Sequence, residues 1–346
     1  MIKKVLAIIA ALAVLAILAI GGVFFWATSA VNTRLAQTFE AHSLELPVPT
    51  PLTDVETEAL RSELLAALDD EVTPDVEAEP VDVLASIDLD ALALERAQER
   101  GKHLVEARFA CVECHGRDFA GGSMVEDGAM GTWLGPNLTG GDGSPVANYT
   151  ISDWDHIVRH GIKSDGTPAI MPSGDYLDMS DRELSDIVAY ITSFAPVAGT
   201  TPAPTFGPIG TMLMATAKLP LSAEEIADHH ATHRALPPET GNTAEFGRHL
   251  AQVCTGCHRA DLSGGPIAIG PPSWPAAANL TPHQDGLEGW TYEQFVTAMR
   301  DGERPDGAII NAPMTLMMPY ADEMTEVELQ ALWTYTQSVD SKPLGI

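Results

Sequence analysis

The sequence predicts an all-α protein in which two copies of one small helical domain follow a single N-terminal transmembrane helix. Three observations support this prediction: an apolar run near the N-terminus, a pattern of segments that occurs twice, and apolar residues at helical spacing in each copy. The expected parts are an anchor over residues 1–30, a spacer over 31–90, one domain over 91–196, a strap over 197–221 and a second domain over 222–346.

The apolar run is long enough to cross a bilayer. It extends from Val5 to Trp26, and a helix of 22 residues spans ~33 Å. Lys3 and Lys4 precede it and favour a cytoplasmic N-terminus, so the remainder of the chain would be exported. The sequence Thr28-Ser29-Ala30 is compatible with cleavage, which leaves a removed signal peptide as the alternative.

The spacer is strongly acidic. From Thr53 to Asp90 it has 13 acidic residues and one basic residue, a composition that resists compact burial. We therefore expect a solvated spacer that gives the domains reach from the membrane, with a short amphipathic helix over about Asp54 to Leu68 as the alternative. The strap is rich in Pro, Gly and Thr, and we expect it to pack along the seam between the two domains.

All four cysteines lie in two pentapeptides of the pattern Cys-x-x-Cys-His. Cysteines at i and i+3 with a histidine at i+4 lie on one face of a helical turn, so two thioether bonds can hold a porphyrin edge while the imidazole reaches the iron. A disulfide-exchange pair or half of a zinc site would not require the adjacent histidine. The pattern predicts two covalently bound haem c groups, attached at Cys111, Cys114 and His115 and at Cys254, Cys257 and His258.

The surroundings of these motifs also occur twice. Matching segments lie 141 to 147 residues apart, as expected for a tandem duplication with small loop insertions. The matches are Asn137-Leu138-Thr139 with Asn279-Leu280-Thr281, Arg159-His160-Gly161 with Arg300-Asp301-Gly302, Met171-Pro172 with Met318-Pro319, and Ser180 and Tyr190 with Thr325 and Tyr335.

Each copy has the elements of a small helical domain. A helix-like stretch with an internal glycine, Gly101 or Gly247, precedes each attachment motif, and a second helix with a Ser or Thr N-cap follows each Met-Pro pair. The glycine would let the two helices cross at close range, and Tyr190 or Tyr335 on the crossing helix would cover the haem edge. A domain of this size cannot build a large core alone, so the porphyrin would act as core.

With these motifs, both halves resemble class I c-type cytochrome domains. The whole chain resembles the membrane-anchored dihaem cytochromes c of bacterial respiratory chains, including electron-transfer subunits of membrane dehydrogenases, over about residues 91–346. The resemblance implies a motif histidine as fifth iron ligand and a loop methionine as sixth, namely His115 with Met171 and His258 with Met318. It also implies a single-pass protein of the bacterial inner membrane with its haem domains in the periplasm.

Other methionines compete for the sixth positions. Met171 precedes a proline in a polar loop, where a core residue is less expected, and Met179 is its alternative. In the second copy Met314 and Met317 compete with Met318, and only Met318 keeps the following proline. Met171 and Met318 are therefore the predicted ligands, and core packing is expected for the methionines that do not ligate.

Two kinds of polar residue, an asparagine and an arginine, occur at matching positions in both copies. Asn137 and Asn279 could bind a haem propionate or form an Asx turn, and neither role is favoured. Arg159 and Arg300 could pair with propionates, but we expect them to cap the helices on which they lie.

Several histidines lie outside the attachment motifs. His103 and His249 are too near those motifs along the chain to reach the opposite haem face, so we expect a surface role rather than ligation. His229 and His230, in an acidic stretch without a counterpart in the first copy, are expected to be solvated.

The formal net charge of −29 excludes nucleic acid as a partner and disfavours anionic lipid surfaces. It favours a basic redox partner, such as a soluble cytochrome c or a copper protein, although an acidic surface can also serve solubility alone. A membrane dehydrogenase and a terminal oxidase are the expected membrane partners, and residues 5–26 would contact the membrane itself.

The predicted function is transfer of single electrons on the extracytoplasmic side of a bacterial membrane, as a carrier or as a subunit of a respiratory complex. One alternative is the electron-accepting cytochrome subunit of a membrane dehydrogenase. The other is a dihaem peroxidase, which requires an open iron position that a methionine in both copies disfavours. We therefore predict no catalytic residue and an electron-transfer protein rather than an enzyme.

Overall fold

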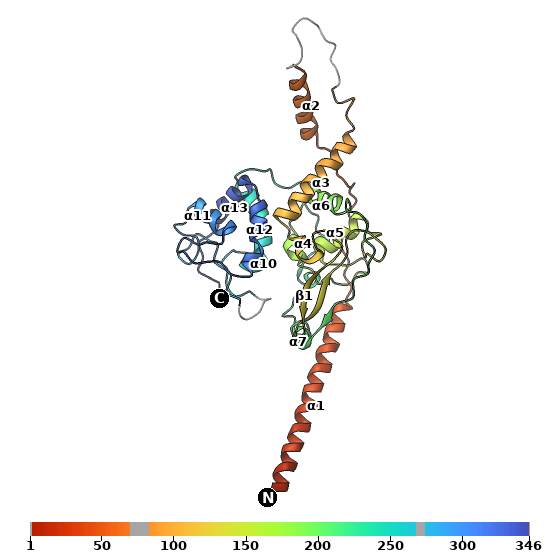
Figure 1. Ribbon diagram of the computed structural model, residues 1–346, viewed down its shortest axis with the longest axis vertical. Helices are drawn as coiled ribbons and strands as arrows, with labels where there is room; N and C mark the ends of the chain where they lie inside the picture. The colour runs from red at the N-terminus through yellow and green to blue at the C-terminus, as the bar shows by residue number, and fades with distance from the viewer. Residues whose placement is uncertain (1, 70–82, 268–273, 346) are drawn as a thin grey trace.

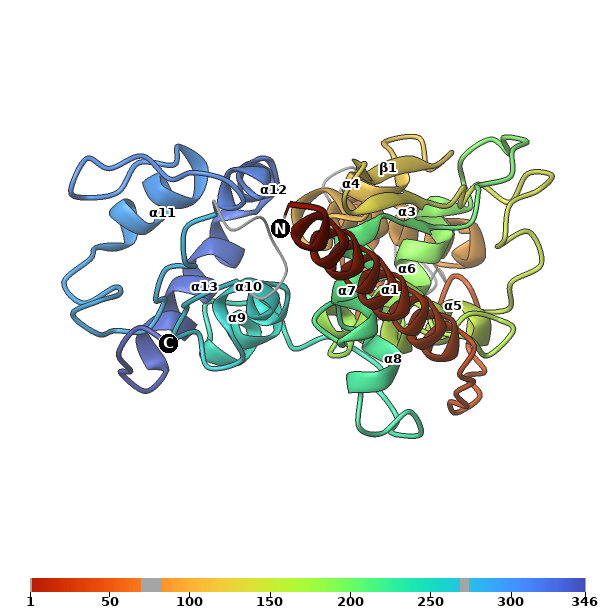
Figure 2. The same cartoon turned by 90° about the horizontal axis from the view of Figure 1, so that it is seen from below.

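A computed structural model of the chain describes residues 2–69, 83–267 and 274–345. It is mainly helical, with a long N-terminal helix that leads into the first of two domains lying side by side (Figure 1). Seen from below, the N-terminal helix runs across the first domain, and the second domain lies beside it (Figure 2).

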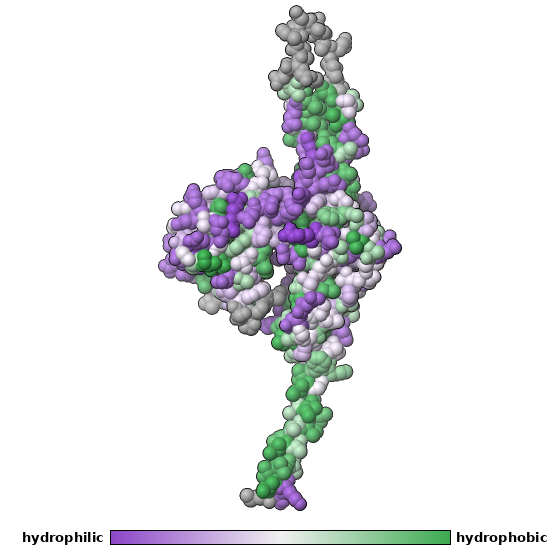
Figure 3. All heavy atoms as spheres, viewed as in Figure 1, coloured by the Kyte–Doolittle hydropathy of each residue, from purple (hydrophilic) through white to green (hydrophobic). Residues whose placement is uncertain are grey.

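Helix α1 (Ile2–Leu35) contains the predicted transmembrane segment and extends beyond it. It is long and apolar enough to cross a membrane, and its apolar window is exposed throughout (Figure 3). Its last two turns are different, because Ala27 and Val31 are buried. Val31 packs with Met214 of α7 (Pro208–Ala215), and Arg34 forms an ion pair with Glu224 of α8 (Ser222–Glu225).

The first domain is built on two crossing helices, as the sequence predicts. Gly101 of α3 (Leu89–Ala107) lies against α6 (Asp181–Ile191), where an added Cβ would overlap the carbonyl oxygen of Asp186. The remaining helical elements are α4 (Cys111–His115), α5 (Ile151–His160) and η1 (Ser173–Tyr176).

The second domain repeats this crossing. Gly247 of α9 (Ala244–Leu250) lies against α13 (Glu326–Ser338), and an added Cβ would overlap the carbonyl oxygen of Ala331. The other helical elements are η2 (Ala251–Cys254), α10 (Thr255–His258), α11 (Tyr292–Arg300), η3 (Met314–Leu316) and α12 (Met318–Glu323).

The last helix of each domain begins with a capping box. Ser180 accepts a hydrogen bond from the N–H of Glu183, whose carboxylate accepts one from the N–H of Ser180. Thr325 and Glu328 do the same at the start of α13. Both predicted N-caps are therefore confirmed.

A small antiparallel sheet is the part of the first domain that the sequence did not predict. Strands β1 (Gly122–Asp127), β2 (Gly131–Gly135) and β3 (Thr205–Phe206) lie in the order β1-β2-β3, with Thr132 opposite Thr205. Because β3 and α7 belong to the strap, the strap packs on the first domain and on α1. The prediction that it lies along the seam between the domains is wrong.

The spacer also lies on the first domain. Phe39 donates its N–H to the carbonyl of Gly166 at 2.9 Å, and residues 54–69 form helix α2 (Asp54–Asp69). Glu56 of α2 forms an ion pair with Arg182 at 2.7 Å, so at least one spacer carboxylate is neutralised on the domain surface. The helical alternative is therefore correct, and most of α2 is exposed, as expected of a solvated spacer. The segment between α1 and α2 lies against the first domain instead, and residues 70–82 lie outside the described residues.

Candidate haem sites

Both attachment motifs form a single helical turn. In the first domain the whole motif is α4, and in the second it spans the junction of η2 and α10. The four cysteines form no disulfide with one another, and burial raises the pKa of Cys111 and of Cys254 to about 12. A thiol with so high a pKa is a poor thiolate nucleophile, which argues against a disulfide-exchange site. The arrangement fits two thioether bonds to one porphyrin edge.

The motif histidines are oriented by the same contact in both domains. His115 donates from Nδ1 to the carbonyl of Pro136 at 2.9 Å, and His258 donates from Nδ1 to that of Ala278 at 2.8 Å. A carbonyl only accepts, so the lone pair is left on Nε2, where it can bind iron. Burial lowers the pKa of both imidazoles and thereby favours their neutral, ligating form.

The repeated asparagines form Asx turns, one of the two roles that the sequence left open. Asn137 Oδ1 accepts from the backbone N–H of Thr139 at 2.9 Å and from its hydroxyl at 2.7 Å. Asn279 and Thr281 make the same pair of bonds. Each asparagine amide also donates to a carbonyl beyond the last helix of its domain, Val197 or Lys342.

The repeated arginines do not cap their own helices, so that prediction is wrong. Arg159 is fully buried and donates to the carbonyl of Met179 at 3.0 Å, just before the N-cap of α6. Arg300 donates to the carbonyl of Met324 at 2.9 Å, just before the N-cap of α13. Each guanidinium therefore binds the start of the next long helix of its domain. The acceptor carbonyl is distant in sequence, so the local sequence does not reveal this contact.

The candidate sixth ligands lie in half-buried positions. Met171 precedes η1, and its carbonyl accepts from the hydroxyl of Ser222 at 2.9 Å. Met318 begins α12, and its side chain lies against Gly302, where an added Cβ would lie 3.2 Å from the sulfur. Met179, the alternative in the first domain, is 3% exposed in the core. Ligation by Met171 and Met318 stays a prediction.

Met314 and Met317, the alternatives in the second domain, lie close to Met318. Met314 begins η3, and Met317 directly precedes α12. Both are half-buried, as Met318 is, so burial does not separate these three candidates as it separates Met171 from Met179.

The two attachment motifs lie at the contact between the domains. In the first domain η1 provides neighbouring side chains for both motifs: Tyr176 packs against the same apolar core as Cys111, and the carboxylate of Asp175 lies against Gly256. Burial raises the pKa of Asp175 to about 6. From the second domain, Tyr320 donates its hydroxyl to Glu113 at 2.9 Å. Each motif therefore contacts the segment that follows the Met-Pro pair of the other domain.

Two reciprocal ion pairs close the same contact. His249 Nε2 lies 2.8 Å from Glu183 of the first domain, and His103 Nε2 lies 2.9 Å from Glu328 of the second. Because matching residues exchange partners, the domains meet about an approximate two-fold axis, as identical subunits do. The prediction of a surface role is wrong for His249, which is 3% exposed, since its partner lies on the other copy.

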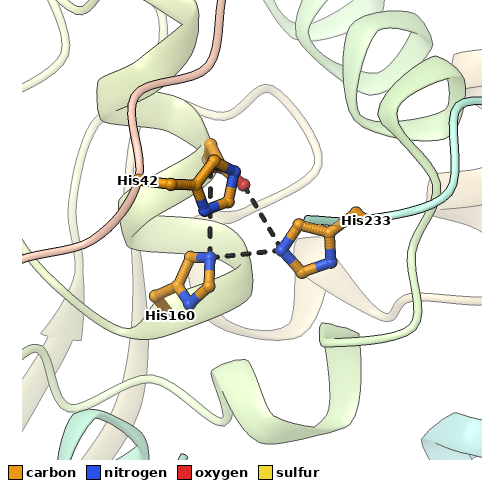
Figure 4. A group of neighbouring side chains, drawn as sticks. His42, His160 and His233 are labelled. Atoms are coloured by element: carbon orange, nitrogen blue, oxygen red, sulfur yellow. Dashed lines mark hydrogen bonds and ion pairs between the residues drawn. The ribbon is translucent and has the colours of Figure 1, made fainter. Parts of the chain in front are cut away.

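A separate histidine cluster lies outside the haem sites, on the first domain. It includes His42, His160 and His233 (Figure 4). His229 borders the cluster, with its Nδ1 3.2 Å from Nδ1 of His160, and is half-buried. The prediction that His229 is solvated is therefore wrong, whereas His230 is exposed as expected.

Comparison with protein-family models gives one match in each half. Residues 96–191 match the model described as subunit III of cbb3-type cytochrome c oxidase, and residues 244–340 match the model of cytochrome c. The matched ranges contain both attachment motifs and both predicted methionines.

Curated relatives are cytochrome subunits of dehydrogenases. The chain is 25% identical to the cytochrome c subunit of quinone-type alcohol dehydrogenase from Gluconobacter oxydans (strain 621H), over 71% of this chain and 55% of the relative. It is 26% identical to the fructose dehydrogenase cytochrome subunit of Gluconobacter japonicus, over 70% of this chain and 52% of the relative. It is 34% identical to the gluconate 2-dehydrogenase cytochrome c subunit of Pantoea cypripedii, over 34% of this chain and 28% of the relative. The chain spans about half the length of the first two.

Proposed function

This chain belongs to the c-type cytochromes, with one such domain in each half, and from that premise we propose that it transfers single electrons as the cytochrome subunit of a membrane dehydrogenase. When bound, each haem iron supplies a one-electron couple. The observation that carries the proposal is the contact between the domains, which brings the two attachment motifs together.

The residues of each site hold the cofactor and exclude a substrate. The cysteine pair would hold the porphyrin edge, and the Nδ1 hydrogen bond of His115 or His258 would orient the imidazole toward the iron. Met171 and Met318 would fill the opposite positions. With six ligands in place there is no open position for chemistry, which is the requirement that separates a carrier from a peroxidase.

The electron path we propose crosses the contact between the domains. Asp175 and Tyr176 lie side by side in η1, one against the second attachment motif and the other against the first. Val253, next to Cys254, packs into the core of the first domain, so the contact is apolar as well as charged. Such a packed contact would hold the two attachment motifs, and with them the two haems, at a constant separation.

Helix α1 would keep the protein at the membrane through residues 5–26. Cleavage after Ala30 would cut α1 in the middle of its packed end, where Ala27 is fully buried and Val31 is 4% exposed. We therefore propose a retained anchor with the haem domains on the periplasmic side. The mass of the mature chain tests retention directly.

The printed names of the relatives suggest the class of partner. They are subunits of alcohol, fructose and gluconate dehydrogenases, so we propose a membrane dehydrogenase that oxidises an alcohol, a sugar or a sugar acid. A soluble cytochrome c, a copper protein or a terminal oxidase would then accept the electrons.

Purification from membranes in mild detergent tests this proposal. We expect a dehydrogenase subunit to elute with the haem protein, and its substrate to reduce both haems. A haem protein that elutes alone and is reduced by no membrane dehydrogenase would overturn the complex. In that case, rapid reduction by a soluble redox protein would identify a free carrier.

A further inference from the structure

We propose that His42, Asp155, His160 and His233 form a binding site for a zinc-type divalent cation, separate from the haem sites. One ligand atom from each residue lies within 4.8 Å of those of the other three. The four residues come from three separate parts of the chain: the segment after α1, helix α5, and the linker between α8 and α9. Figure 4 shows the three imidazoles turned toward one point.

The distances between the ligand atoms fit a small tetrahedral site. His160 Nε2 and His233 Nε2 are 3.2 Å apart, and His42 Nε2 is 3.3 Å from Asp155 Oδ2. A zinc ion with bonds of ~2.0–2.1 Å places its ligand atoms ~3.3 Å from one another. Nε2 of His160 lies 4.0 Å from Oδ2 of Asp155, and Nε2 of His233 lies 4.0 Å from the other carboxylate oxygen, Oδ1. A side-chain shift that brings Oδ2 toward both imidazoles would complete the site.

The hydrogen bonds around the cluster direct three lone pairs inward. His233 donates from Nδ1 to the carbonyl of Leu177 at 2.9 Å, and His42 donates from Nδ1 to the carbonyl of His229 at 3.3 Å. Carbonyls only accept, so in both rings Nε2 has the lone pair. This outward anchoring of Nδ1 is the arrangement that metal-bound histidines adopt.

The third ring is oriented through His229. His229 donates from Nε2 to the carbonyl of Ala223 at 3.0 Å, so its Nδ1 can only accept. The donor is Nδ1 of His160, 3.2 Å away, and this assigns the lone pair of His160 to Nε2. His160 and His233 therefore turn two lone pairs toward each other at 3.2 Å, which is repulsive until a cation lies between them.

Asp155 supplies a buried carboxylate oxygen that lacks a hydrogen-bond donor. The residue is fully buried, and its Oδ1 accepts from Nε of Arg159 at 2.6 Å. Its Oδ2 is buried and accepts no hydrogen bond, although it faces His42 and His160. Such an oxygen is costly to bury unless a charge compensates it. A cation among the imidazoles would provide that charge.

The donor set selects the kind of metal. Three imidazoles and one carboxylate suit zinc and its transition-metal neighbours, whereas calcium and magnesium prefer oxygen ligands. Arg159, a cationic side chain beside the site, is itself paired with Asp155 and with Asp181 at 2.8 Å. These two carboxylates offset its charge.

The ion would join three segments that lie far apart in the sequence. His42 belongs to the segment that leads from α1 along the first domain, and His233 belongs to the linker that leads to the second domain. Binding to both, and to α5, would fix the orientation of the haem domains relative to the anchor. With four protein ligands and burial of Asp155 and His160, the expected role is structural.

The test uses the full chain with both haems attached, in detergent, after dialysis against a chelator. Zinc is titrated calorimetrically, and metal analysis gives zinc relative to haem iron. We expect one zinc for every two irons, a higher unfolding temperature with zinc, and an X-ray absorption spectrum with imidazole and oxygen neighbours only.

Variants locate the bound ion. His233→Ala and His42→Gln should each weaken zinc binding by about 100-fold or more, because each removes a direct ligand. His229→Ala should weaken it by about 10- to 100-fold, because His229 only orients His160. His230 is an exposed neighbour of His229, so His230→Ala is the matched control and should bind zinc as the parent does.

Three results would overturn the site. They are a parent protein that binds no stoichiometric zinc, a loss in His230→Ala as large as that in His233→Ala, and unchanged binding in His42→Gln. Since His42 lies at the partly exposed edge of the cluster, its variant should fold even where His233→Ala does not. Haem spectra should stay unchanged in every variant, which separates this site from the haem sites.

Discussion

The two haem domains have the same internal design but different surroundings. Both have a crossing glycine, an Asx turn, an arginine that fastens the last helix, and a motif histidine bonded to a carbonyl. In the part of the chain that the structure describes, it is the first domain that packs against α1, α7, the sheet and the segment after α1. The second contacts the first through α12, α3 and the attachment motifs (Figure 1).

This difference separates two tasks. The repeated residues build a site for haem, and the elements that occur once fix where that site lies relative to the membrane. Among the described residues α1 packs on the first domain, so the second domain would be the one left to meet a redox partner. The predictions below test first the shared design and then the asymmetry.

The crossing glycines should show the largest effect. Gly101→Ala and Gly247→Ala would gain about 1 kcal/mol of helix propensity but force the crossing backbones apart, at a cost of about 3 kcal/mol or more. We expect loss of the corresponding haem domain, seen as half the haem content in purified protein. Gly128→Ala, where an added Cβ meets nothing within 4 Å, is the control. Normal haem content in either crossing variant would contradict the shared design.

Replacing a predicted sixth ligand should let carbon monoxide bind to the iron, whereas replacing another methionine should not. Met171→Ala and Met318→Ala should each leave the haem attached but open one iron position, so the reduced protein binds carbon monoxide at that haem. Met124→Leu, at an exposed position, should bind none. If Met171→Ala binds carbon monoxide no better than the parent, the assignment is wrong. If Met317→Ala binds carbon monoxide and Met318→Ala does not, Met317 is the sixth ligand of the second haem.

The reciprocal ion pairs should be unequal in strength. Glu183 meets Arg108 at 2.6 Å and His249 at 2.8 Å in buried surroundings, so Glu183→Gln should lower the free energy of unfolding by about 3 kcal/mol. The His103 side chain is 37% exposed, so Glu328→Gln should cost less than about 1 kcal/mol. Glutamine preserves both capping boxes, so each variant reports the ion pairs of its carboxylate, two for Glu183 and one for Glu328. Equal losses in denaturant unfolding would rule out this asymmetry.

The contact between the domains should also depend on pH. Although burial opposes it, the charges of Arg108 and His249 lower the pKa of Glu183 from 4.5 to about 2, so its contribution is complete above about pH 4.5 and is lost toward pH 2. The hydrogen bond to Glu328 raises the pKa of His103 above 6.5, so its contribution is complete below about pH 6.5 and is lost as pH rises through the raised value.

Unfolding temperature measured against pH checks both limits. Stability from these two groups should be greatest between about pH 4.5 and 6.5, and His103→Gln should flatten the alkaline side only. An unchanged alkaline side in that variant would show that His103 does not contribute.

The sequence predicts whatever is local or repeated. The attachment motifs, the N-caps Ser180 and Thr325, and the crossing glycines are all short patterns present twice, and each is confirmed as an element of the fold. Contacts between distant segments were missed. His249 lies next to a glycine in a helix-like stretch, and nothing local shows that its partner is Glu183 of the other copy.

The same limit explains the histidine cluster and the spacer. His42, Asp155 and His233 lie far apart in the sequence, and only the folded first domain brings them together. Acidic composition suggested a solvated spacer, but composition does not reveal that Glu56 would meet Arg182. The haem sites could be predicted because the duplication repeats their motifs. The elements that occur once have no repeated pattern that would point to them.

Haem content together with the spin state of the isolated, fully loaded protein tests the central claim most directly. With a histidine and a methionine on each iron, we predict two haems c per chain, both low-spin when oxidised and both unreactive toward carbon monoxide when reduced. A single haem, or one resting high-spin iron, would contradict electron transfer through two closed sites and indicate a catalytic centre instead.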